Sequence, residues 1–173
     1  EGPTETPVEY FTYTVADAGV TITGYTGKDK VVVIPATIEG KPVITLGNAA
    51  FKANRTLTSV TVPASVTKIG NEVFRGCTAL TEVNLNEGVT SIGTFCFGLC
   101  VKLTSFTAPK SLTSIGTSAF NGCSALDIVD LGNVKNIKGS AFSGCTKLCA
   151  TAAAQRLLIP ETVVELGASA FLN

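Results

Sequence analysis

The chain has 173 residues, of which 45% are hydrophobic and 15% are charged, so it is long and apolar enough to bury the core of about one domain. Its 13 Lys and Arg balance its 13 Asp and Glu, which leaves no basic excess for binding nucleic acid. The absence of histidine excludes Ser-His-Asp and Cys-His catalysis and every histidine-containing metal site, and no apolar run is long enough to span a membrane.

Residues 1–9 contain three Glu and two Pro and show no apolar pattern. This composition predicts a flexible, solvated leader between an export or anchoring segment and the folded part of the chain. An ordinary frayed terminus is the alternative interpretation.

Residues 10–30 show the alternation of a β-hairpin. Phe11, Tyr13 and Val15 alternate with polar residues, a turn follows around Asp17, and the alternation resumes at Val20. We expect this hairpin to cover the first coil of a repetitive fold, because the end of such a fold needs a cap. The three tyrosines all lie in this segment and form either part of this cap or an aromatic contact patch.

A repeat occupies the rest of the chain, residues 31–173. The phrase Ile-Gly-x-x-x-Phe, in exact or degraded form, ends at six phenylalanines separated by 23, 23, 23, 22 and 29 residues: Phe51, Phe74, Phe97, Phe120, Phe142 and Phe171. After each of the first five, Asn or Cys follows three residues later and Leu three residues after that. A period of this length predicts a solenoid of about six coils, the last one incomplete.

Each period has a physical interpretation. Val60 and Val62 alternate with polar residues, as in a half-buried strand, and Pro63 ends the strand. Gly70 opens a tight corner, and a short helical turn carries Phe74 into the core. One repeat cannot bury enough apolar surface to fold alone, so neighbouring repeats must stack.

The strand phrase Leu-x-x-Val-x-Val-Pro and the corner phrase Ile-Gly-x-x-x-Phe-x-x-Cys closely resemble the BspA-like, or Treponema-type, leucine-rich repeat of bacterial surface proteins. The resemblance covers about residues 31–171. It implies an α/β solenoid, a right-handed superhelix with a concave parallel β-sheet and short helical or 3-10 turns on the convex side. It also implies an exported protein, found outside the cell or on its surface, and some members of the family adhere to host matrix or plasma proteins.

Three coils depart from the pattern. The first contains an insertion at residues 38–42, which we expect to form a surface loop, and the fourth is one residue shorter and has Lys138 at the corner. The fifth gains six residues near 149–154, rich in helix formers. Insertions in solenoids often form binding loops and are as often neutral.

The last coil ends at Phe171 without a polar cap. Either the chain is a fragment or another chain covers this end. Because an open strand edge beside apolar residues favours association, we expect a homodimer through the C-terminal coil.

The six cysteines do not indicate disulfides or a metal. Four of them occupy one position of the repeat, so their side chains point in the same direction and not at each other: Cys77, Cys100, Cys123 and Cys145. Cys96 takes a packing position, and Cys149 lies at the insertion, where we expect exposure. The two Cys-x-x-x-Cys pairs lie too far apart for one tetrahedral zinc site. We therefore expect buried thiols and no metal or other cofactor.

The strand alternation predicts one exposed face that is small and polar, with apolar ends and no aromatic cluster. Its outward positions form the candidate protein-contact face: Ser59, Thr61, Glu82, Asn84, Ser105, Thr107, Ile128, Asp130, Arg156 and Leu158. No nucleophile, acid–base pair or phosphate loop stands out beside it, so we expect no enzyme activity.

Two functions remain open at this stage. The first is a non-catalytic adhesion or protein-binding module, whose ligand would be a host extracellular matrix or plasma protein. The second is a structural spacer that projects another domain from the cell surface.

Overall fold

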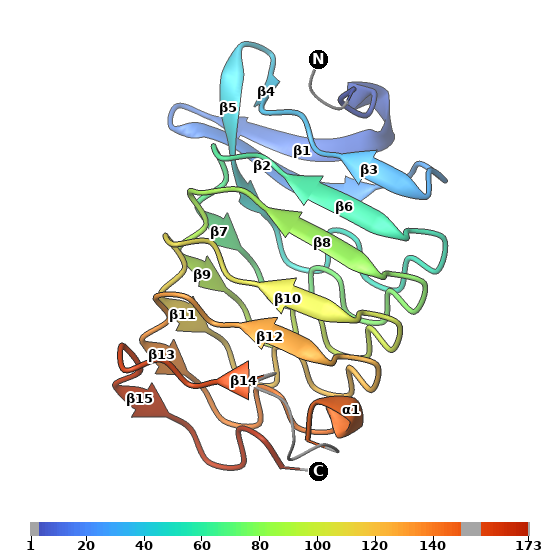
Figure 1. Cartoon of the computed structure of the whole chain (residues 1–173). Helices are drawn as coiled ribbons and strands as arrows, with labels where there is room; N and C mark the ends of the chain where they lie inside the picture. The colour runs from blue at the N-terminus through green and yellow to red at the C-terminus, as the bar shows by residue number, and fades with distance from the viewer. Residues whose placement is uncertain (1–3, 150–156, 173) are drawn as a thin grey trace.

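In the computed structural model, residues 4–149 and 157–172 are described, and they form an elongated stack of coils with the two termini at opposite ends (Figure 1). Each coil contributes one strand to each of two sides of the stack. The first side, which we call the strand face, contains β3 (Val31–Val33), β6 (Ser59–Val62), β8 (Glu82–Leu85), β10 (Ser105–Thr107), β12 (Ile128–Asp130) and β14 (Leu157–Leu158). The predicted parallel solenoid is therefore confirmed, and Val60 and Val62 are fully buried as the alternation requires.

A second parallel ladder runs along the neighbouring side, which we call the corner side. It joins β2 (Gly19–Tyr25), β5 (Lys41–Leu46), β7 (Lys68–Ile69), β9 (Ser91–Ile92), β11 (Ser114–Ile115), β13 (Asn136–Ile137) and β15 (Glu165–Leu166). The sequence predicted only a corner here, because most of these strands have two residues and are too short to show alternation. In both ladders the partners lie one repeat apart, as with Ile69 and Ile92.

Between the corner side and the next strand, each coil passes through consecutive turns. Some amides bond within the coil, as Lys52 N does to Ala49 O, while alternate amides bond to the next coil, as Phe51 N does to Val73 O. Left-handed backbone recurs in these turns, with φ of 59° at both Ala49 and Ala53. Such residues interrupt a right-handed helix, so these segments are non-helical turns and not the short helical turns that were expected. The helices of the described residues are η1 (Val8–Tyr10) and α1 (Thr146–Cys149).

The turns place a column of stacked phenylalanine rings at the centre of the core. Consecutive ring centroids are separated by 5.2, 5.3, 5.1, 5.0 and 5.2 Å from Phe51 through Phe171. Phe74, Phe97, Phe120 and Phe142 are fully buried. The column thus runs the whole length of the stack and explains why the phenylalanine spacing was so regular in the sequence.

The N-terminal end is closed by the predicted hairpin. β1 (Phe11–Ala16) pairs antiparallel with β2, which in turn joins β5 in parallel. The Tyr25 ring stacks on Phe51 with centroids 5.3 Å apart and contacts Phe11 at 5.2 Å, so it extends the phenylalanine column. This packing favours the capping interpretation of Tyr25, whereas Tyr10 is 39% exposed.

Part of the expected leader is held against the first coil. Thr6 N bonds to Val33 O at 2.9 Å, Val33 N bonds to Thr6 Oγ1 at 3.0 Å, and Thr6 is buried. Glu5 Oε1 accepts a hydrogen bond from Ala36 N. Because the free edge of β3 offers backbone partners, these two residues are held at that edge, where Thr6 is buried and Glu5 is exposed. The division into a leader (1–9), a cap (10–30) and a solenoid (31–173) otherwise stays a prediction.

The insertion in the first coil forms a tight hairpin and not a loop. β4 (Thr37–Ile38) pairs antiparallel with the start of β5, and Ile38 is 2% exposed. Glu39 and Gly40 both have positive φ, 52° and 73°, as the favoured two-residue hairpin turn requires. Ile38 thus adds to the core, while Glu39, Gly40 and Pro42 are exposed, as expected for a surface segment.

Candidate interaction surface

The strand face presents most of the residues that the sequence proposed for protein contact. The register aligns Ser59 with Glu82 and Thr61 with Asn84 in one half, and Ser105 with Ile128 and Thr107 with Asp130 in the other, so the predicted columns exist within each half. Ser59 and Thr61 are half-buried, and the other six of these residues are exposed. Arg156 lies outside the described residues, and only the backbone of Leu158 is described, opposite Asp130.

The strand face is interrupted between its third and fourth strands. β3, β6 and β8 form one sheet and β10, β12 and β14 another, and no ladder joins β8 to β10. Elsewhere the first residue of the strand donates to the preceding coil, as Glu82 N does to Thr58 O and Ile128 N to Thr104 O. Within the described chain, no such backbone bond leads from Ser105.

Two substitutions within the repeat accompany this interruption. Phe106 takes the inward position that valine fills in the neighbouring coils, and Ala108 takes the following inward position, where valine, leucine or isoleucine lies elsewhere. The Phe106 ring packs against Phe120 with centroids 4.7 Å apart. Pro109 follows, and because proline has no N–H it cannot make the bond that Asn86 N makes to Val62 O one coil earlier. The Leu85 carbonyl therefore lacks this donor.

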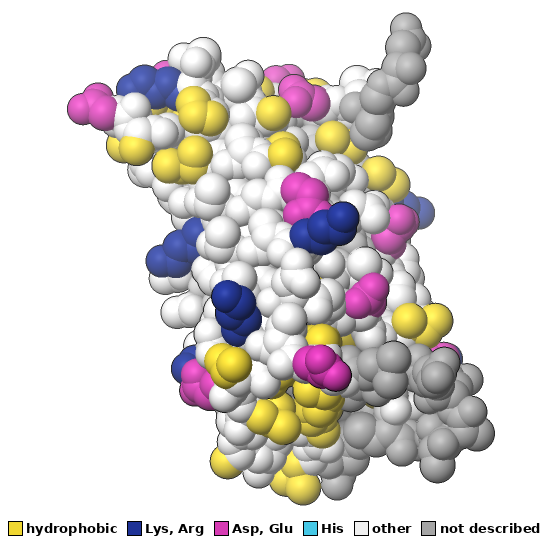
Figure 2. Space-filling view, turned by 60° about the vertical axis from the view of Figure 1, so that its left-hand side comes forward, with side chains coloured by type: hydrophobic (Ala, Val, Ile, Leu, Met, Phe, Trp, Pro, Cys, Tyr) yellow, Lys and Arg dark blue, Asp and Glu magenta, His cyan; other side chains and the backbone are white. Residues whose placement is uncertain are grey.

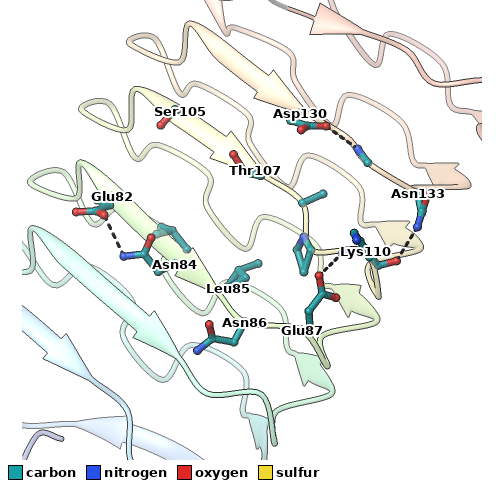
Figure 3. A pocket seen from close by; sticks show the side chains of 14 residues that line it. Glu82, Asn84, Leu85, Asn86, Glu87, Ser105, Thr107, Lys110, Asp130 and Asn133 are labelled. Carbon is teal, nitrogen blue, oxygen red and sulfur yellow. Dashed lines mark hydrogen bonds between the residues drawn. The ribbon is translucent and has the colours of Figure 1, made fainter. Parts of the chain in front are cut away.

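A hollow of about 830 Å³ opens over the interruption (Figure 3). Its floor is partly apolar and its walls are polar, and it lies over β8, β10, β12 and the loops that follow them. The lining residues are Glu82, Val83, Asn84, Leu85, Asn86, Glu87, Ser105, Thr107, Ala108, Pro109, Lys110, Asp130, Gly132 and Asn133. Five members of the predicted contact face thus lie around one concave site.

The carboxylates of the hollow are oriented by hydrogen bonds. Glu87 Oε1 accepts from Lys110 N at 3.0 Å and Oε2 from Ser111 N at 3.1 Å. These backbone N–H groups, the Lys110 amide first, lower the pKa of Glu87. Asp130 Oδ1 accepts from Gly132 N at 2.9 Å, and Glu82 Oε1 accepts from the Asn84 side-chain amide at 3.0 Å (Figure 3).

The loop residues of this hollow, above all Glu87, Lys110 and Asn133, were not predicted from the sequence. Only strand positions were, because alternation assigns directions to side chains in strands but not in loops. A signal was nevertheless present: Asn86-Glu87-Gly88 follows β8, where the preceding coil has Pro63-Ala64-Ser65 after β6. Gly88 has φ 136°, and a Cβ there would lie 2.1 Å from Ala64 O. This position of the loop therefore needs glycine.

The cysteines lie in the core, away from this surface. In the shared column, each thiol donates to the carbonyl of the phenylalanine one coil earlier, at 3.0–3.2 Å: Cys77 to Phe51, Cys100 to Phe74, Cys123 to Phe97 and Cys145 to Phe120. These four and Cys96 are buried, as expected. Burial raises the pKa of Cys77 to about 12.

The described part of the chain contains no group of three or more His, Cys, Asp or Glu that fits a metal ion. The exposure expected for the Cys149 side chain, and the helical insertion expected over 149–154, fall on side chains or residues outside those described, apart from the backbone of α1. None of the described helices is both long and apolar enough to cross a membrane.

Comparison with known proteins adds the following. The family model of the BspA type leucine-rich repeat region matches residues 44–173 in six copies. A crystal structure of a T. pallidum leucine-rich repeat protein is similar at 30% identity and a TM-score of 0.68, over 96% of this chain and 82% of that one. No curated protein sequence matches.

Two further solved structures come from longer chains. A leucine-rich cell surface protein of Faecalibacterium prausnitzii is 30% identical with a TM-score of 0.66, over 99% of this chain and 52% of that one. The pneumococcal vaccine antigen PcpA, at 23% identity and a TM-score of 0.72, shares the fold over 94% of this chain and 46% of its own. The chain thus spans about half the length of these two proteins.

Proposed function

Because the chain belongs to the BspA-type leucine-rich repeat family, we propose that it is a non-catalytic protein-binding module whose contact surface is the strand face. The observation that carries the proposal is the hollow over β8, β10 and β12, around which five of the residues chosen from the sequence lie. Small exposed polar side chains such as Ser105 and Thr107 let a partner approach the strands closely. The absence of histidine supports a binding role over a catalytic one.

We propose further that the protein is exported and acts at the cell surface or outside the cell, where it adheres to a host extracellular matrix or plasma protein. The support for the location is the similarity to a protein described as a leucine-rich cell surface protein. The neutral net charge supports a protein partner over nucleic acid.

A matched pair of variants tests this function. Thr107→Arg places a long side chain in the hollow, whereas Thr117→Arg places the same side chain at an exposed position in the turns. Proteins captured by the immobilised chain from plasma and solubilised matrix are compared by quantitative mass spectrometry. We expect at least one ligand that Thr107→Arg loses and Thr117→Arg retains. If no ligand is captured, or if both variants retain every captured protein equally, the strand face is not the binding surface.

A spacer role is the second candidate, and the observation that favours it is the length of the similar proteins, about twice that of this chain. A spacer acts by its length and not by its surface. Deleting one repeat from the full-length protein on cells would then change the reach of the parts beyond it. Thr107→Arg would change nothing.

We also propose that the chain forms a homodimer through its C-terminal coil. Apolar side chains gather at this end of the molecule (Figure 2), and Val164, Leu166 and Leu172 are 79%, 50% and 60% exposed. Burying them against a second copy would remove apolar surface from water. Light scattering at tens of micromolar should give the mass of a dimer, and Leu166→Asp should give a monomer while Thr117→Asp remains dimeric. A monomeric wild-type chain at that concentration contradicts the dimer.

A further inference from the structure

The hollow carries an excess of negative charge that the chain does not neutralise. Glu82, Glu87 and Asp130 line it, against one basic residue, Lys110. Among the described residues, ion pairs connect Glu72 to Lys52 and Arg75, and others engage Asp17, Asp127 and Glu165, but none engages the three carboxylates of the hollow. Since the whole chain has zero net charge, this excess is local.

These carboxylates are held in place but retain accepting capacity. Asp130 uses Oδ1 for Gly132 N, which leaves Oδ2 for another donor. The two oxygens of Glu82 contact Asn84 Nδ2 at 3.0 Å and Ser59 Oγ at 3.5 Å, and the second contact is at the limit of a hydrogen bond. Because the carboxylates are already oriented, a cationic group that binds them costs little side-chain entropy.

Pro109 leaves a further acceptor beside the carboxylates. Opposite Leu85, the position from which a backbone N–H would come is Pro109, so the Leu85 carbonyl has no donor from that position. Leu85 and Pro109 both line the hollow. A ligand with several N–H donors therefore fits this site better than a ligand that accepts hydrogen bonds.

The floor of the hollow suits an aliphatic stem. Val83, Ala108 and the partly buried Leu85 lie beneath the polar rim. Arginine combines such a stem with a planar head of five donors and a permanent charge. We propose that the hollow binds an arginine side chain presented by the protein partner, which deepens the proposed binding function and rests on it.

The test uses two short peptides and the isotope-labelled chain. The probe is acetyl-Gly-Arg-Gly-Arg-Gly-amide, and its control has citrulline, a neutral isostere, in place of each arginine. In NMR titrations we expect saturable shifts of the Thr107, Lys110 and Asp130 amides with the arginine peptide only. They should vanish in about 1 M salt, where charges are screened beyond about 3 Å. Shifts elsewhere, equal shifts with citrulline, or none overturn the proposal.

Variants separate binding from folding. Glu82→Gln with Asp130→Asn should weaken the arginine peptide roughly 2- to 30-fold, as expected for two exposed ion pairs. The charge-matched control, Glu72→Gln with Asp17→Asn, should leave the affinity unchanged. Lys110→Gln removes the repelling cation and should strengthen binding, an effect that misfolding cannot produce. The proposal is wrong if Lys110→Gln does not strengthen binding, or if the control variant loses as much affinity as Glu82→Gln with Asp130→Asn.

The outcome is distinguishable from failure of the proposed function. If Thr107→Arg abolishes capture of a protein ligand but the arginine peptide does not bind the hollow, the strand face remains the contact surface and the arginine specificity is wrong. If neither the capture nor the peptide depends on the hollow, both are wrong.

Discussion

On the corner side of the stack, the parallel ladder runs from β5 to β15 without interruption, whereas on the strand face it stops between β8 and β10. From β5 to β15 the corner strands all end in Ile or Leu, and the residue that follows is glycine in every coil but one. The strand face tolerates larger departures, such as Phe106 and Ala108 in one coil. The difference indicates that the corner and the turns maintain the stack, while the strand face is free to vary and to form a binding site.

The phenylalanine column that the turns place in the core should contribute most to stability. Phe97 is fully buried and stacks between Phe74 and Phe120, so Phe97→Ala should lower the free energy of unfolding by about 3–5 kcal/mol. Phe171 is only partly buried, so Phe171→Ala should cost much less. Urea denaturation of both variants measures the difference, and equal losses contradict the stacked column.

The buried thiols of the core should make stability fall at high pH. The pKa of Cys77 is raised from 9.0 to about 12 in the folded chain. Below pH 9 both states hold the proton. Between pH 9 and 12 the unfolded chain releases it and the folded chain does not, so the free energy of unfolding falls by about 1.4 kcal/mol per pH unit for this thiol. The slope measured by urea denaturation should be smaller by that amount in Cys77→Ala, and identical slopes would refute burial of the thiol.

The turns also contain a local defect that can be repaired. Leu99 has φ 61°, while the equivalent Gly76 and Gly122 both have φ 73°. Left-handed backbone costs a non-glycine residue about 1–2 kcal/mol, and glycine loses about 0.5–1 kcal/mol in flexibility, so Leu99→Gly should stabilise by about 0.5–1 kcal/mol. Thermal denaturation measures the gain. Lys102→Gly, where φ is not positive, should instead destabilise, and the same sign in both would contradict this account.

Closure of the strand face should change the hydrogen exchange of a few amides more clearly than it changes stability. Phe106→Val with Ala108→Leu restores the inward residues of the neighbouring coils at nearly constant volume, so stability should change by less than about 1.5 kcal/mol. If Phe106 causes the interruption, amide hydrogen exchange at Ser105 and Thr107 should slow as the ladder to β8 forms. Unchanged exchange would show that neither Phe106 nor Ala108 causes the interruption.

The sequence predicted the coils, the buried columns and the strand register because these depend on local periodicity, which a repeat shows many times over. It missed the second ladder, whose two-residue strands show no period, and the hairpin of β4 and β5, whose hydrophobic residue Ile38 has no counterpart in other coils. For the candidate site, alternation identified Glu82, Asn84 and Thr107 but not Glu87. The orientation of loop side chains and the loss of the ladder between β8 and β10 depend on how two neighbouring coils pack. The sequence pattern of a single repeat does not show this packing.

The hydrogen bonds that join one coil to the next have a mechanical consequence. Since they run along the stack and the termini lie at opposite ends (Figure 1), a force pulling the termini apart loads the coils in series. Coils should then detach one at a time, and each released repeat of 23 residues would lengthen the chain by about 76–83 Å. Extension under force would thus proceed in nearly equal steps. The 22-residue spacing before Phe142 and the 29-residue spacing before Phe171 would stand out as one slightly shorter and one distinctly longer step.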